Sequence, residues 1–217
     1  MIEVTYVNHM GNDLTVVNAA RVSFGKESTW DDYDSEECQY VLNDKDRKLV
    51  HYLAKHKHMS PFGHCFATFH IKAPIFVARQ LVKHKFLRWN EISRRYVDSE
   101  PEFYEPDVWR GRSEDKKQGS DGIVDVGDWG DTSWACLTAY KDLLAHGVCP
   151  EQARMVLPQS TMTEWYWSGS LDAFADMCNL RTTDDTQFET RLAAVLLSNK
   201  MLELFPVSWY ELLRTIR

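Results

Sequence analysis

The chain has 217 residues, of which 44% are hydrophobic and 26% are charged, and its formal net charge is -7 at pH 7. This balance is typical of a globular protein with a substantial core and excludes a disordered or fibrous chain. The acidic charge argues against general nucleic-acid binding, which depends on Lys and Arg contacts to phosphates. An anionic ligand would therefore need a local basic cluster.

Cysteine usage indicates a reducing compartment. The five cysteines are dispersed, odd in number and without a CxxC pair, which argues against a disulfide framework or a zinc ribbon: Cys38, Cys65, Cys136, Cys149 and Cys178. Cys149 precedes Pro150 at a predicted helix start and is the candidate nucleophile, whereas Cys65 and Cys178 are expected in the core. The chain opens without a signal-peptide core, and no apolar run is long enough to span a membrane. We expect a cytoplasmic protein.

The first third of the chain predicts alternating strands and helices. Residues Ile2–Val7 alternate as a strand, Leu14–Phe24 has helical spacing, and a helix is expected from Asn43 to about Lys57, with Asn43 or Asp44 as its cap. A strand is expected over Cys65–Lys72, and its alternation places Cys65, Ala67, Phe69 and Ile71 on one face.

The remainder is mostly helical. Pro74 suits the first turn of a helix reaching about Phe86, and Glu91–Val97 is expected to be extended. The polar, Gly-rich stretch 98–132 is expected to form a surface excursion. Further helices are expected at Ser133–His146, from Pro150 to before Pro158, and at Ser170–Leu180, Thr183–Leu204 and Ser208–Ile216. The predicted fold is a single α+β domain over 1–217, with helices packed around a small, mostly antiparallel sheet.

A basic cluster stands out in this acidic chain. Its six members fall within thirteen residues: Lys83, His84, Lys85, Arg88, Arg94 and Arg95. Gln80 and His84 share a helical face because they are four residues apart, and Glu91, Ser93 and Arg95 alternate along the expected strand. Arg and Lys beside polar groups suit a phosphate. A solvated charged strip has the same composition, so the cluster alone leaves both interpretations open.

Two further groups of residues are candidates. His56, His58 and His64 could ligate a metal ion, although cations near a helix C-terminus are favourable in any case. Arg181 follows an apolar stretch at a predicted helix end and can project into a cleft. Asp172, Asp176 and Asn179 share a helix face that would otherwise be an ordinary polar surface.

Several motifs together resemble flavin-dependent thymidylate synthases. That family carries Arg-His-Arg, seven residues and Ser; here Lys83-His84-Lys85 is followed by seven residues and Ser93, and the tail reads Asn90-Glu91-x-Ser93-x-Arg95-Tyr96. Matching segments occur in the same order elsewhere, covering roughly Leu14–Arg191: His58-x-Ser60-Pro61-Phe62, Phe69–Gln80, Ala153-Arg154-x-Val156-Leu157-Pro158, Thr163-Glu164, Asn179-Leu180-Arg181 and Gln187-x-Glu189.

The resemblance implies reductive methylation of dUMP to dTMP, with methylenetetrahydrofolate as one-carbon donor, NADPH as reductant and FAD as redox carrier. It implies a homotetramer whose sites combine several chains. The implied dUMP contacts are Gln80, Lys83, Glu91, Ser93, Arg95, Arg154 and Arg181, with Arg181 as the catalytic cation that favours the N3-ionised uracil. The implied FAD contacts are Ser60, Lys83, His84, Lys85, Glu91, Ser170, Asp172 and Asp176. His58 and Tyr96 would line the pocket for folate or NADPH.

The chain also departs from the family pattern. Lys83 and Lys85 replace arginines, which keeps the charge but loses the bidentate fork. Ser170-Leu171-Asp172 stands in place of Asn-x-Arg, so a carboxylate occupies a position where a cation usually meets the flavin nucleotide, and Asp176 replaces Asn or His. Two alternatives stay open: a binding module for nucleotides or single-stranded nucleic acid that uses Trp89, Tyr96 and the cations, and a histidine-ligated metal hydrolase.

Overall fold

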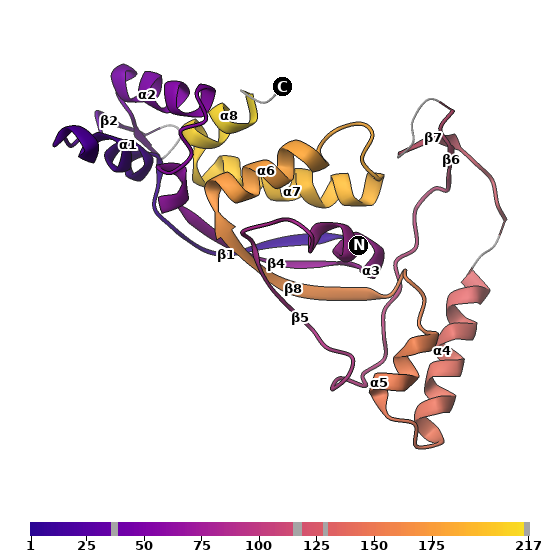
Figure 1. Ribbon diagram of the computed structural model, residues 1–217. Coiled ribbons are helices and arrows are strands. Elements are labelled where there is room, and N and C mark those ends of the chain that lie inside the picture. Colours follow the sequence, from indigo (N-terminus) through magenta and orange to yellow (C-terminus); the bar gives the residue numbers. More distant parts are fainter. Residues whose placement is uncertain (36–38, 115–118, 128–129, 215–217) are drawn as a thin grey trace.

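A four-stranded antiparallel sheet forms the centre of the computed structural model, which describes residues 1–35, 39–114, 119–127 and 130–214 (Figure 1). Its strands are β1 (Glu3–Met10), β4 (Phe66–Pro74), β8 (Met162–Ser170) and β5 (Arg88–Glu91), in the order β1-β4-β8-β5. In the register, Phe69 pairs with Trp167, and Trp167 also pairs with Trp89. The predicted α+β class with a small antiparallel sheet is confirmed for this part of the chain.

Helices cover one face of this sheet. The helices α6 (Leu171–Arg181) and α7 (Phe188–Leu204) lie across it, and α3 (Ile75–Leu81) flanks them (Figure 1). The predicted alternation in β4 is confirmed, since Cys65, Ala67, Phe69 and Ile71 are all buried. Phe69 and Trp167 each pack edge-on against Phe174 of α6, at centroid distances of 5.6 Å and 5.4 Å. This apolar layer fixes where the helix ends lie.

The helices near both ends of the chain form a second layer beside the sheet: α1 (Asp13–Arg21), α2 (Asp44–Lys55) and α8 (Pro206–Arg214). Asn43 caps α2, as predicted, because its side chain accepts from the Asp46 N–H. The Asp13 carboxylate accepts from the backbone N–H groups of Val207 (3.0 Å) and Ser208 (2.8 Å), and so binds the N-terminus of α8.

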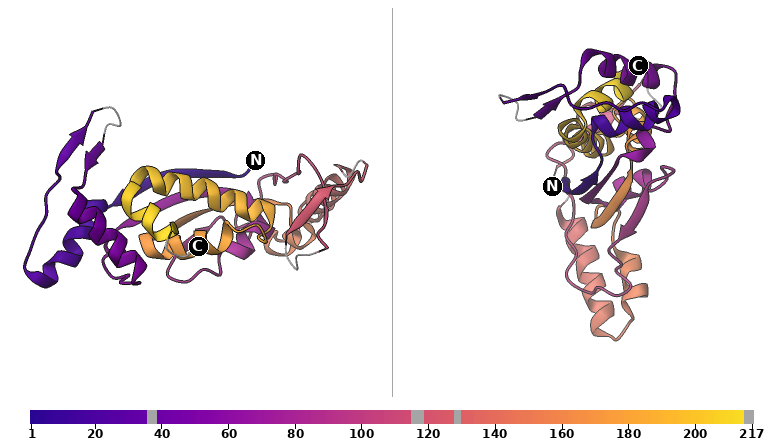
Figure 2. Two further views of the ribbon diagram at one scale, coloured as in Figure 1. Left: turned by 90° about the horizontal axis from the view of Figure 1, so that it is seen from above. Right: turned by 90° about the vertical axis from the view of Figure 1, so that its left-hand side faces the viewer.

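The other elements extend from this body. A hairpin of β2 (Asp32–Asp34) and β3 (Gln39–Val41) lies near α1, and a hairpin of β6 (Arg110–Arg112) and β7 (Ser120–Ile123) lies at the other end. The helices α4 (Gly130–Ala145) and α5 (Pro150–Ala153) form an arm that projects from the body (Figure 2). None of the helices in the described ranges is long and apolar enough to cross a bilayer.

Several sequence predictions require correction. The last long helix begins at Phe188 rather than at Thr183. The helix after Pro74 ends at Leu81 rather than near Phe86, and Phe86 has a left-handed φ of 65°. The extended segment is β5, and residues 94–96 form a turn in which the N–H groups of Tyr96 and Val97 donate to the Ser93 carbonyl. The strand β8 was not predicted at all, although Trp165 and Trp167 alternate with the exposed Tyr166.

Candidate nucleotide and flavin sites

The segment that contains Lys83-His84-Lys85 leaves helix α3 after Leu81 and bends back toward α6. Val77, Ala78 and Leu81 of α3 are buried in the core, so Gln80 lies on the free side of the helix. Because α3 ends before His84, the spacing of four residues does not bring Gln80 and His84 onto one helical face. The two residues meet instead at a common partner, Arg181.

Arg181 is the last residue of α6, and its guanidinium contacts both ends of this bend. Its Nε donates to His84 Nε2 over 3.0 Å, and its Nη2 donates to the Gln80 carbonyl over 3.4 Å. An imidazole nitrogen that accepts from Arg carries no proton itself, so His84 is neutral here. Burial and the nearby Arg181 charge lower the pKa of His84 to about 4.

These residues border a first cavity of about 720 Å³, a size typical of small-molecule sites. It joins Gln80, Lys83 and Arg181, which were predicted from the sequence, to residues that were not predicted as its lining. The lining residues are Phe76, Gln80, Lys83, Tyr104, Pro106, Val108, Trp109, Arg110, Gly119, Ser120, Ser160, Arg181, Gln187 and Glu189. Those from 104–120 come from the segment that was expected to be a surface excursion.

A chain of polar side chains crosses the wall of this cavity. Gln80 Nε2 donates to Gln187 Oε1 over 2.5 Å, and Gln187 Nε2 donates to Glu189 Oε2 over 3.2 Å. Glu189 also forms an ion pair with Arg110, whose Nε donates to Ser120 Oγ over 2.9 Å. The sequence marked Gln187 and Glu189 as a motif, but it gave no signal that Arg110 would reach them.

Glu91, Ser93, Arg95 and Arg154 do not line the first cavity. Glu91 lies on β5, where it accepts from Thr163 Oγ1 over 2.6 Å and from Trp89 Nε1 over 3.0 Å. Arg95 donates to Ser93 Oγ over 3.1 Å and stacks over the exposed Tyr96 ring. Arg154 lies after α5 and donates to the Glu151 carbonyl. The predicted dUMP contacts thus form separate groups within this chain.

A second cavity, of about 630 Å³, lies between α1, α2 and the turn before β4. It contains His58 and Ser60, as well as cations and aromatic rings that were not predicted as site residues. Its lining is Ala19, Ala20, Arg21, Ser23, Phe24, Lys26, Leu49, Tyr52, Leu53, His58, Ser60 and Pro61. The rings of Tyr52 and His58 are stacked, with centroids 5.9 Å apart.

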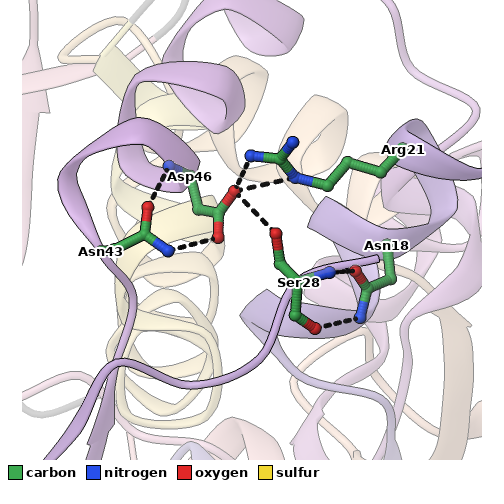
Figure 3. A network of polar contacts seen from close by, with 5 residues as sticks. All are labelled: Asn18, Arg21, Ser28, Asn43 and Asp46. Carbon is green, nitrogen blue, oxygen red and sulfur yellow. Dashed lines mark hydrogen bonds and ion pairs between the residues drawn. The ribbon is translucent and has the colours of Figure 1, made fainter. Parts of the chain in front are cut away.

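A buried carboxylate holds one wall of the second cavity in place (Figure 3). Asp46 is fully buried, and its Oδ1 accepts from Arg21 Nε (2.9 Å) and from Ser28 Oγ (3.1 Å). Its Oδ2 accepts from Asn43 Nδ2 over 2.8 Å. Asn18 exchanges hydrogen bonds with the backbone of Ser28, and this closes the loop between α1 and β2.

The other predicted FAD residues lie on α6 and after α3. Ser170 precedes the first turn of α6, and Asp172 and Asp176 follow one turn apart. Burial raises the pKa of Asp176, the Asp172 charge raises it further and Lys57 opposes both. Asp172 Oδ1 is buried and has no hydrogen-bond partner among the described residues. Lys85 is exposed beyond the end of α3.

The histidines are distributed among different partners. His51 Nδ1 lies 2.7 Å from Glu211 Oε2, and the rings of His56 and His58 both pack near Tyr52. Over the described ranges, no three His, Cys, Asp or Glu side chains form a group that could hold a metal ion.

The cysteine predictions are partly resolved. Cys65 and Cys178 are buried, as expected, and burial raises the pKa of Cys65 to about 12. Cys149 is exposed just before α5, while Cys38 lies outside the described residues.

The family model for "Thymidylate synthase complementing protein" matches residues 5–207 of this chain. The chain belongs to this family. A flavin-dependent thymidylate synthase of Thermus thermophilus is 37% identical over 95% of this chain and 73% of its own length. The flavin-dependent thymidylate synthase of Thermosipho africanus is 36% identical over 96% of this chain and 89% of its own length. The UMP/dUMP methylase PolB of Streptomyces cacaoi, solved with 5-Br dUMP, superposes with a TM-score of 0.80 at 30% identity, covering 97% of this chain and 94% of PolB.

Proposed function

We propose that this protein is a flavin-dependent thymidylate synthase that methylates dUMP to dTMP. Methylenetetrahydrofolate donates the one-carbon unit and NADPH supplies the reducing equivalents. The family membership supports the reaction class, and the similarity to PolB, a UMP/dUMP methylase, supports a uridine monophosphate as substrate. The observation that carries the proposal is the first cavity, where Gln80, Lys83 and Arg181 converge on a space of suitable size.

We assign the uracil and phosphate of dUMP to this cavity. Arg181 supplies a preorganised positive charge, because its Nε and Nη2 are held by His84 and by the Gln80 carbonyl. A fixed cation beside uracil stabilises the N3-ionised base and makes C5 more nucleophilic. Lys83 is exposed at the rim and supplies a second cation for the phosphate.

We propose further that Glu91, Ser93, Arg95 and Arg154 complete the site from another copy of the chain in a homotetramer. Within one chain these residues lie on β5, on the following turn and after α5, and they do not line the first cavity. The sheet face that carries Tyr166 and Phe66 leaves both side chains substantially exposed, at 52% and 43%, which is consistent with contact between copies.

The second cavity fits part of FAD by its donor set. Lys26 can meet phosphate, Phe24 and Tyr52 can pack against a planar ring, and Ser60 and His58 can donate hydrogen bonds. Asp172 and Asp176 do not fit phosphate, because carboxylates repel it; they suit the hydroxyl or amino groups of the nucleotide. When bound, FAD would pass reducing equivalents from NADPH to the transferred one-carbon unit.

A visible spectrum of the purified protein tests this function. We expect flavin absorption, either on purification or after adding FAD, and faster NADPH oxidation when dUMP is present. A colourless protein that does not take up FAD would contradict the proposal. Salt-sensitive oligonucleotide binding would then favour a nucleic-acid module, and stoichiometric metal with chelator-sensitive hydrolysis would favour a metal hydrolase.

A further inference from the structure

The outer wall of the first cavity comes from a part of the chain that is separate from the central sheet. Seven of its fourteen lining residues lie between 104 and 120: Tyr104, Pro106, Val108, Trp109, Arg110, Gly119 and Ser120. The part of this wall that begins at Tyr104 is bound to the rest of the protein through its backbone, since the Tyr104 N–H donates to the Ser160 carbonyl over 2.8 Å. The part of the wall that follows along the chain is the hairpin of β6 and β7, which forms its own two-stranded sheet.

A two-stranded hairpin is marginally stable unless it packs against other elements. Here Arg110 joins the hairpin to α7. Its guanidinium pairs with Glu189 in the first turn of α7 and lies 4.4 Å from the centroid of the Phe188 ring. Gly119 forms a second point of approach, because a Cβ on it would lie 3.4 Å from the Asp184 carbonyl oxygen.

The charges of this pair also determine the charge of the cavity. The described lining has the cations Lys83, Arg110 and Arg181 and the carboxylate Glu189. Glu189 is only 3% exposed, so its interaction with Arg110 is weakly screened by solvent. Since Arg110 and Glu189 neutralise each other, Lys83 and Arg181 remain for the ligand. Two cations match the charge of a phosphate monoester.

We propose that the Arg110–Glu189 pair selects a nucleoside monophosphate, by holding the β6–β7 hairpin as the cavity wall and by cancelling a third positive charge. This proposal rests on the proposed function, because it takes the first cavity to be the dUMP site. Arg110 and Glu189 act here as positioning and charge-compensating residues, and neither takes part in the chemical step.

Arg110→Met tests the wall, because Met retains an apolar side chain against Phe188 but loses the ion pair. We expect the Kd for dUMP, measured by calorimetry on the flavin-loaded protein, to rise about tenfold, because a buried carboxylate loses its partner. We also expect faster trypsin cleavage after Arg112, which is exposed on the same hairpin. Arg112→Ala is the matched control for binding, and it should leave the Kd for dUMP unchanged.

Glu189→Gln tests the charge compensation. It leaves Arg110 without its carboxylate, so the Kd for dUTP should fall relative to that for dUMP by about threefold or more, as an added cation favours the more highly charged ligand. Thermal melts of both variants check that they fold. An Arg110→Met variant with wild-type dUMP affinity, or a Glu189→Gln variant with unchanged selectivity, would overturn the proposal.

The proposed function can fail separately. If the folded wild-type protein binds no dUMP at all, the assignment of the cavity is wrong. The cleavage comparison still decides whether Arg110 holds the hairpin, because it requires no nucleotide: equal trypsin sensitivity of Arg110→Met and wild type would remove Arg110 from that role.

Discussion

The first cavity borders the helices that cover the sheet, and the second lies among the helices of the second layer; beside each, a buried carboxylate in the first turn of a helix forms an ion pair. Asp46 of α2 binds Arg21 beside the second cavity, and Glu189 of α7 binds Arg110 beside the first. Asp46 gathers partners from residues 21–43, whereas Glu189 reaches a residue 79 positions away. The same device can therefore stabilise a local loop or recruit a distant segment into a site.

The largest effect expected at either cavity comes from Arg181. Arg181→Ala should abolish dTMP formation, because it removes the fixed cation that we place beside the uracil. The measurement is dTMP production with saturating FAD and NADPH. Lys200→Ala removes a partly exposed cation of α7 that pairs with Glu203, and should retain full activity as the control. Full activity in Arg181→Ala would mean that the first cavity is not the site of the reaction.

The next largest effect concerns the folded state around the second cavity. Asp46→Ala should lower the free energy of unfolding by about 3 kcal/mol. The substitution leaves the Arg21 guanidinium without its carboxylate, and it leaves the Asn43 amide and the Ser28 hydroxyl without an acceptor. Urea denaturation measures this loss, and FAD titration should show weaker binding as the wall of the cavity loosens. Asp44→Ala, in the same helical turn but exposed, should change stability far less. Equal losses in both variants would contradict the role given to Asp46.

A smaller effect should appear in the pH dependence of stability. His84 has a pKa of about 4 in the folded protein, below its ordinary value of 6.5, so the unfolded chain binds the extra proton first. Stability should therefore rise as the pH increases from about 4 to about 6.5. The Nε2 atom that accepts from Arg181 is lost as an acceptor when it is protonated. His84→Asn should flatten this part of the curve of unfolding midpoint against pH; an unchanged slope would assign the pH dependence to other groups.

Prediction from the sequence was most successful where the determinants are local. The Asn43 cap and the buried alternation of β4 were predicted correctly because each is encoded in a short stretch of residues, and the family because several short motifs occur in the expected order. The early end of α3 was missed, since helical spacing continues through Lys83 to Phe86 while tertiary packing turns the chain there. The strand β8 was missed although its burial alternates, because the three consecutive aromatic residues Trp165, Tyr166 and Trp167 hide the period of two.

The residues of the candidate site also divide into those that belong to local motifs, which were predicted, and those that tertiary folding brings in, which were not. Gln80, Lys83 and Arg181 were predicted because they belong to recognisable motifs, and the first cavity brings them together. Arg110 was not, because its polar, Gly-rich surroundings are typical of an exposed loop and no local pattern shows that its side chain will meet Glu189. Arg21 and Lys26 line the second cavity through the folding of α1 onto α2, which a linear pattern does not report.

The contact between Asp13 and the start of α8 has a consequence for the order in which the molecule forms. Asp13 lies in α1, whose C-terminal end supplies a wall of the second cavity, and its buried carboxylate accepts from the N–H groups of Val207 and Ser208. During synthesis, α1 leaves the ribosome long before these partners exist. The packing of α1, and with it the final position of this wall of the second cavity, is therefore completed only when α8 has been translated.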